Sequence, residues 1–226
     1  PLTLLKLKEN YNLYVKTRPP TVIICAIERR KGQLPPEVTF RYQKDPIFKT
    51  LTALGIGTEL SDSGYCWAAC LDMALSPFMP EGSRQQLIVD TVRNEKLLTE
   101  AFSAKGGLII EKLGDFVEVM NEELLKRNRS ERLRLIKEQR LVDYHLELQR
   151  GRAVIFATAT SEEGHMMVMD KFYVDGGKII DSVWNPAVSN PLEAHVHPDS
   201  FQLYGMNTYS QTKILSFIIS VGTDGE

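Results

Sequence analysis

The chain has 226 residues, of which 43% are hydrophobic and 25% charged, a composition typical of a globular protein with one sizeable core or a core plus a small accessory domain. Its net charge of −2 gives no electrostatic signature of binding to nucleic acid or to an anionic membrane, and no apolar run reaches the length of a membrane span. Three cysteines are too few for a disulfide framework and indicate free thiols.

Residues 1–52 are predicted to form a β-rich N-terminal extension or small accessory domain. "TVIICAIE" (21–28) and "EVTFRYQ" (37–43) are rich in β-branched and aromatic residues, and turn-forming residues lie between them. The segment contains no chemical motif. We interpret it as an extension that could contact a protein partner.

Residues 63–150 are predicted to form a helical half. "CWAACLDMAL" (66–75) lacks helix breakers, and Ser83 and Asn94 are suitable N-caps for the next two helices. Two further helices are predicted by apolar residues that recur every three or four positions, namely Ile109, Leu113, Phe116, Met120 and Leu124, and then Leu133, Ile136, Leu141, Tyr144 and Leu148. The dense charge between residues 126 and 140 is interpreted as a solvated face and turn, with a binding patch as the alternative.

Residues 151–226 are predicted to form an antiparallel sheet half. The expected strands are rich in residues of high β propensity: "AVIFATA" (153–159), "HMMVMDKFYV" (165–174), "KIIDSV" (178–183) and "KILSFIISV" (213–221). Asp175-Gly176-Gly177 is a strong hairpin signal, whereas "EAHVHPDS" (193–200) is interpreted as a loop. The sequence therefore predicts an α+β domain over residues 53–226, with a cleft between its helical and sheet halves.

Cys66 is the first candidate for chemistry. It follows the turn-forming run "SDSG" and opens an uninterrupted helix, so we expect it in the first helical turn. A helix N-terminus and a neighbouring imidazolium both lower the pKa of a thiol, and the thiolate is the nucleophilic form. The backbone N–H of Cys66 would also be free to bind an oxyanion. Cys70, one turn deeper among apolar residues, is interpreted as a core residue.

The partner base is expected to be a histidine, and His165 is the best placed of the four. It opens a predicted strand at the rim of the sheet half, directly after a Ser-Glu-Glu-Gly segment. His145 is interpreted as a surface or packing residue, and His195 and His197 as loop residues. Asp181 lies sixteen residues after His165 in the next predicted strand, where its carboxylate could hold the imidazole tautomer and stabilise the charged ring.

These segments resemble the papain-like cysteine proteases. In "GYCWAAC" (64–70) the cysteine is followed by tryptophan and small residues, as in the active-site segment of that family. Residues 151–186 are similar to the second half of the same fold, where Gly-His precedes an apolar strand and an asparagine or aspartate lies in the next one. Aspartate in that position is closer to bacterial branches of the family, namely bacteriocin-processing peptidases and effector proteases delivered into host cells. The resemblance covers residues 58–221.

This resemblance implies a cysteine protease that cleaves a peptide bond through an acyl-enzyme intermediate. Cys66 would be the nucleophile, His165 the general base and Asp181 the third member of the triad. It implies a helical half packed on an antiparallel sheet half, a protein or peptide substrate, and no cofactor or metal. By the same resemblance, the protein could be a bacterial effector or toxin that is secreted or delivered into a host cell.

One feature of the family is missing. Its members usually have a glutamine a few residues before the cysteine, whose side-chain N–H completes the oxyanion hole, whereas residues 57–66 contain no glutamine or asparagine. Ser61, Ser63 or a backbone N–H could substitute, but an ionised Glu59 could not donate. Because loss of one such donor costs on the order of 100- to 1,000-fold in rate, the chain could be a weak enzyme, one completed by a partner, or a pseudoenzyme.

Other interpretations of the same residues stay open. A glutamine deamidase or transglutaminase uses the same acyl chemistry on a Cys-His-Asp triad, and a non-catalytic binding module could retain the fold. Without the histidine and aspartate segments, "CWAAC" would be an ordinary buried helix. A zinc site could be built from two cysteines and two histidines, although their spacing is not a standard structural zinc pattern: Cys66, Cys70, His195 and His197.

Overall fold

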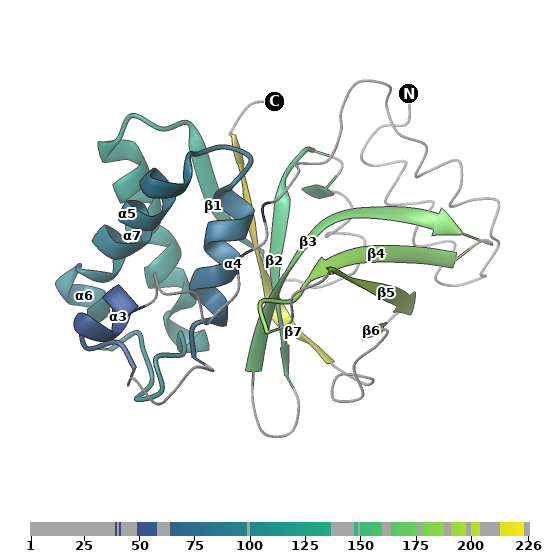
Figure 1. The fold of residues 1–226 in the computed structure, drawn as a ribbon, viewed down its shortest axis with the longest axis horizontal. Coiled ribbons are helices and arrows are strands. Elements are labelled where there is room, and N and C mark those ends of the chain that lie inside the picture. The colour runs from purple at the N-terminus through teal and green to yellow at the C-terminus, as the bar shows by residue number, and fades with distance from the viewer. Residues whose placement is uncertain are drawn as a thin grey trace.

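The computed structural model of this chain describes residues 39, 41, 49–57, 64–98, 100–136, 147–148, 150–159, 164–175, 178–187, 191–197, 200–203 and 213–223. Within these residues, helices gather on one side and an antiparallel sheet on the other, and α4 (Cys66–Leu75) lies next to the sheet (Figure 1). The predicted α+β fold class is therefore confirmed. None of the described helices is both long and apolar enough to cross a lipid bilayer.

The helical half contains α4 and the elements around it. Their bounds are α3 (Lys49–Ala53), α5 (Glu81–Val92), α6 (Glu95–Leu98), the short 3₁₀ helix η2 (Ile110–Lys112) and α7 (Leu113–Lys126). The helix predicted at residues 66–75 is confirmed. The apolar face predicted for α7 is also confirmed, because the helical members of the periodic set are buried: Leu113, Phe116, Met120 and Leu124.

The two predicted N-caps have different outcomes. The Asn94 side chain precedes α6 and accepts the backbone N–H of Lys96 at 3.0 Å, which is how an N-cap stabilises a first turn. Ser83 is wrong as an N-cap, because α5 already begins at Glu81, with Pro80 in the N-cap position. Proline fixes its own φ and so determines where this helix can start.

The described strands form one seven-stranded sheet in the order β1-β7-β2-β3-β4-β5-β6, with all neighbouring pairs antiparallel. Their bounds are β1 (Glu131–Ile136), β2 (Ala153–Ala159), β3 (Gly164–Asp175), β4 (Lys178–Trp184), β5 (Pro191–His197), β6 (Ser200–Leu203) and β7 (Lys213–Thr223). All four predicted strands are confirmed, with ends that agree to within two residues. The C-terminal strand β7 lies between β1 and β2, so it joins β1 to the rest of the sheet.

The helix predicted from Leu133 and Ile136 is wrong at its start, because both residues lie in strand β1. Residues 132–135 alternate Arg-Leu-Arg-Leu, and this period of two fits a strand better than the spacing of three on which the helix was based. The side chain of Asn121 on α7 also binds the backbone of Leu133, through its Nδ2 to the carbonyl at 2.9 Å and its Oδ1 to the N–H at 2.8 Å. The predicted solvated turn in this stretch is therefore partly an edge strand.

The loop predicted over residues 193–200 is also wrong. His195 and His197 lie in β5, where they are paired with Gln202 and Ser200 of β6. Two histidines and a following proline are poor strand predictors in isolation. Pairing with β4 and β6 on both sides outweighs that weak local preference.

Helix α4 forms the centre of the core. All ten of its residues are buried, and it packs against β2, β3 and α5. Trp67 is 1% exposed and its ring lies 5.1 Å from that of Phe102 and 5.4 Å from that of Phe116. A helix covered on all sides has little freedom to shift, so the residue that opens it has a fixed position relative to the sheet.

The N-terminal extension lies largely outside the described residues. Thr39 and Arg41, which are described, belong to no helix or strand, so the strand predicted over residues 37–43 is not found at these two positions. Arg41 binds the buried carboxylate of Asp72 on α4 at 2.9 Å and Glu81 of α5 at 2.6 Å. Arg41 thus connects this segment to the helical half. The proposed domain boundary after residue 52 falls within α3.

Candidate active site

The Cys66 thiol lies at the start of α4 and faces strand β3. Cys66 is the first residue of the helix and is 8% exposed. Burial raises the pKa of the Cys66 thiol, whereas backbone N–H groups of Met166, Trp67 and Cys66 itself approach the sulfur and lower this pKa by a smaller amount. Because Met166 directly follows His165, this contact brings the sulfur to the backbone of the residue next to the predicted base.

The imidazole of His165 is held by Asn185. His165 is the second residue of β3 and is 9% exposed, and its Nε2 lies 2.8 Å from Oδ1 of Asn185. Asn185 directly follows β4 and is 0% exposed. A buried hydrogen bond of this length fixes the plane of the imidazole ring.

A second contact identifies which end of the Asn185 amide faces the ring. Oδ1 of Asn185 also accepts the backbone N–H of Ala187 at 2.9 Å, and a backbone N–H can only donate. The same oxygen must therefore act as the acceptor toward His165, so Nε2 carries the hydrogen. In the neutral ring this leaves Nδ1 as the basic nitrogen.

Asp181 does not occupy the predicted position. In the strand register, Asp181 is opposite Phe172 of β3, seven residues from His165. Seven residues of extended chain span roughly 20 Å, which is more than two side chains can bridge. The predicted contact between Asp181 and His165 is therefore wrong, whereas Asn185 does bind the imidazole.

Asn185 could have been found from the sequence by following the hairpin. Antiparallel strands pair residues at equal distances from their turn, so the start of β3 meets the end of β4. The register pairs Val168 with Trp184, and its continuation brings His165 level with residues just after β4. Asp181 was predicted because it is a carboxylate in the next strand, without counting how far it and His165 lie from the hairpin turn.

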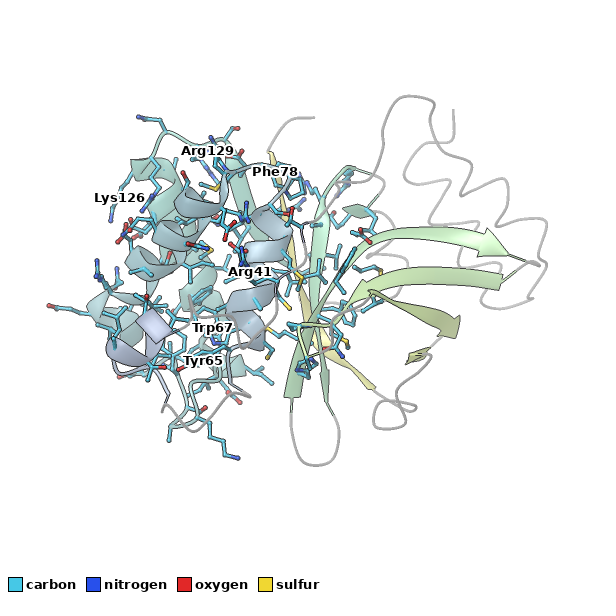
Figure 2. The ribbon with its side chains drawn as sticks, in the orientation of Figure 1. Arg41, Tyr65, Trp67, Phe78, Lys126 and Arg129 are labelled. Atoms are coloured by element: carbon cyan, nitrogen blue, oxygen red, sulfur yellow. The ribbon has the colours of Figure 1, made fainter. Side chains whose placement is uncertain are left out.

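The start of α4 is held by two glycine-containing segments, one around Ile56 and one around Gly106. The sequence analysis identified neither of them. Tyr65 Oη donates to the carbonyl of Ile56 at 2.6 Å, and the indole N–H of Trp67 donates to the carbonyl of Gly106 at 2.9 Å. A Cβ on Gly64 would lie 2.0 Å from the carbonyl oxygen of Lys105, so only glycine fits there. Figure 2 shows Tyr65 and Trp67 at one end of α4, and Arg41 beside a part of α4 further from that end.

Cys70 lies one turn deeper in the same helix, whereas the other histidine candidates lie away from this site or outside the described residues. Cys70 is 0% exposed, and burial, followed by the nearby Cys66, raises its pKa well above the ordinary value; its interpretation as a core residue is confirmed. His195 is opposite Ile180 in β4, which is opposite Tyr173 in β3, far along the sheet from the start of that strand. His145 lies outside the described residues.

The described part of the chain contains no group of three His, Cys, Asp or Glu side chains arranged to hold a metal ion. The proposed substitutes for the missing glutamine, Ser61 and Ser63, and also Glu59, lie outside the described residues. Backbone N–H groups at the start of α4 approach the Cys66 sulfur, and N–H groups at a helix start are of the kind that can stabilise an oxyanion.

The chain has no match among protein-family profiles or among curated protein sequences. The arrangement of Cys66, His165 and Asn185 is therefore the basis for a functional assignment.

Proposed function

We propose that this protein is a papain-like cysteine protease in which Cys66 is the nucleophile, His165 the general base and Asn185 the residue that orients the base. The observation that carries the proposal is the 2.8 Å hydrogen bond between His165 Nε2 and Asn185 Oδ1, formed beside a thiol that contacts the backbone of Met166. A nucleophile, a base and a third group that orients the base are the recurring parts of such sites.

The proposed reaction begins with proton transfer from Cys66 Sγ to His165 Nδ1. The thiolate then attacks the carbonyl carbon of a peptide bond, and the developing oxyanion is stabilised by N–H groups at the start of α4. The imidazolium gives its proton to the leaving amine as the C–N bond breaks, which leaves a thioester on Cys66. Water, deprotonated by His165, hydrolyses the thioester and restores the thiol.

The burial of the thiol makes His165 essential to this scheme. Burial raises the pKa of the Cys66 thiol, so an isolated thiol at this position would be a poor nucleophile near neutral pH. An adjacent imidazolium favours the thiolate because the two opposite charges attract each other in a water-poor site. The hydrogen bond that Asn185 accepts stabilises that imidazolium.

Two alternatives share the same residues. Attack on a glutamine side chain would give deamidation or transglutamination through the same thioester. A non-catalytic binding module is favoured by one observation, the burial that raises the pKa of the Cys66 thiol.

The test is incubation of the full chain with a proteome-derived peptide library, followed by mass spectrometry. We expect new peptide termini with the parent protein and none with Cys66→Ala or His165→Ala. Glutamine converted to glutamate without new termini would replace the protease proposal with a deamidase. No product of either kind would contradict an enzymatic function and favour the binding module.

A further inference from the structure

Helix α4 begins without a capping side chain. Its N-cap residue is Tyr65, with φ −93° and ψ 12°, and no side-chain hydrogen bond caps the helix. The residues usually preferred there are Ser, Thr, Asp and Asn, because their side-chain oxygens accept N–H groups of the first turn. In this chain, the N–H groups of Cys66 and Trp67 instead approach the Cys66 sulfur.

A side-chain oxygen at the N-cap would compete with the sulfur for these donors. An aspartate there would also place a negative charge beside the thiol, which would oppose thiolate formation. A helix start without a capping side chain is less stable, so another interaction is needed to hold it in place.

The hydroxyl of Tyr65 supplies that interaction through two hydrogen bonds to residues outside α4. Its side chain is 5% exposed, and its hydroxyl donates to the carbonyl of Ile56 at 2.6 Å and lies 2.6 Å from Oγ1 of Thr52 on α3. Because the single hydroxyl hydrogen of Tyr65 goes to Ile56, the Thr52 hydroxyl is the donor in the second bond. The Tyr65 hydroxyl therefore links the residue before Cys66 to α3 and the segment that follows it.

The surroundings leave space for this ring. A Cβ on Gly57 would lie 2.9 Å from Tyr65 Oη, and a Cβ on Gly106 would lie 3.1 Å from Tyr65 Cε1. Both glycines also have positive φ, 76° and 80°, which side chains rarely tolerate. The tyrosine side chain therefore packs against two glycines in the left-handed region, where a larger residue would be both strained and too close to it.

We propose that Tyr65 is a positioning residue for the nucleophile: its buried hydroxyl, bound to Ile56 and Thr52, holds the uncapped start of α4 so that the first-turn N–H groups stay directed at the Cys66 sulfur. This inference rests on the proposed function, in which Cys66 reacts as a thiolate. It assigns to Tyr65 an effect on the reactivity of Cys66 in addition to an effect on stability.

The experiment measures the rate at which iodoacetamide alkylates Cys66 as a function of pH, by peptide mass spectrometry, in the full chain. Tyr65→Phe keeps the ring and removes the hydroxyl. Thr91→Val is the matched control, because the buried Thr91 hydroxyl donates to the carbonyl of Leu87 within α5, a different helix from the one that carries Cys66. Thermal unfolding of each variant reports the loss of stability.

We expect Tyr65→Phe to shift the Cys66 profile to higher pH and to slow alkylation at pH 7 by about tenfold. Thr91→Val should lower the melting temperature and leave the profile unchanged. Equal profiles in the parent and Tyr65→Phe would overturn the proposal, whatever the change in melting temperature. This readout needs no substrate, so failure to find peptide cleavage would contradict the proposed function without deciding the role of Tyr65.

Discussion

At the scale of single residues, Asn185 selects the nitrogen of His165 that can act as a base. Its amide oxygen is fixed by the N–H of Ala187 and therefore accepts from Nε2. An amide is sufficient for this role, because orientation requires an acceptor and does not require a charge. Asp181, with its full charge, is opposite Phe172 and too far along the sheet to take part.

Asn185→Ala should lower peptide cleavage by about 10- to 100-fold, because the imidazole loses the contact that fixes its tautomer, and general acid–base catalysis depends on that geometry. Asp181→Ala is the control and should retain parental activity. The comparison is made by kcat/KM on one peptide cleaved by the parent. Loss of activity in Asp181→Ala with retention in Asn185→Ala would contradict the assignment of the third residue.

Cys70 provides a contrasting thiol in the same helix. Burial raises its pKa well above the ordinary value, so the folded state favours the neutral thiol. A group whose pKa is raised on folding contributes stability that is present below its unfolded pKa and is lost as the pH rises through its folded pKa. Cys70→Ala should therefore reduce the loss of stability above about pH 9, as measured by urea denaturation at several pH values. The same alkaline loss in the variant and the parent would contradict this explanation.

At the scale of elements, the local sequence pattern predicted where several strands lie but, beyond the β3-β4 hairpin, not which strands pair with each other. "AVIFATA" has high β propensity, and β2 spans the same residues, 153–159. β1 was not predicted because a charged stretch with two arginines is typical of a solvated turn. It forms a strand here because it pairs with β7, a segment distant in sequence. Gly64 could be predicted as a turn residue, but the steric requirement for glycine there could not, since it comes from a contact with Lys105, forty-one residues away.

Asn121 covers part of the exposed edge of the sheet. Its amide makes two hydrogen bonds to the backbone of Leu133 in β1, as an adjacent strand would, and unpaired edges promote association between chains. Asn121→Ala should lower the free energy of unfolding by about 1–2 kcal/mol and promote concentration-dependent association, measured by light scattering. A monomeric variant of parental stability would contradict this role.

At the scale of the whole molecule, the candidate site requires both halves of the fold. Cys66, the proposed nucleophile, comes from the helical half, whereas His165, the proposed base, and Asn185 come from the sheet half. The start of α4 contacts the start of β3 where the Cys66 sulfur approaches the backbone of Met166, the residue after His165. Composition and motif order were enough to predict the α+β class, whereas the pairing of Cys66 with His165 stays a prediction. They did not give the third residue, because its position depends on the register of β3 and β4, which has to be counted outward from the hairpin turn.

A buried ionic group joins three parts of the chain. Asp72, 1% exposed, binds Arg84 of α5 at 3.0 Å and Arg41 of the N-terminal segment at 2.9 Å. Asp72→Ala should cost about 3–5 kcal/mol of unfolding free energy, because it leaves Arg84 buried without this carboxylate. Arg41→Ala should cost less, since Asp72 keeps Arg84. Equal losses in the two variants, measured by urea denaturation, would contradict this order.

The contribution of Arg41 should also depend on pH. Hydrogen bonding and charge attraction from Arg41 lower the pKa of Glu81 in the folded protein. A lowered folded pKa contributes stability that is present above the unfolded pKa and is lost as the pH falls through the folded value. The stability difference between the parent and Arg41→Ala should therefore shrink below about pH 4. A difference that stays constant from pH 7 to pH 3 would contradict the contribution of Glu81.

The most direct test of the account is the pH dependence of Cys66 alkylation in the parent protein and in His165→Ala. Burial alone raises the pKa of the Cys66 thiol, so the account requires His165 to make this sulfur reactive near neutral pH. It predicts that iodoacetamide labels Cys66 well before Cys70 in the parent, and that in His165→Ala the Cys66 profile moves to higher pH. Identical Cys66 profiles in the two proteins would contradict the assignment of Cys66 and His165 as nucleophile and base.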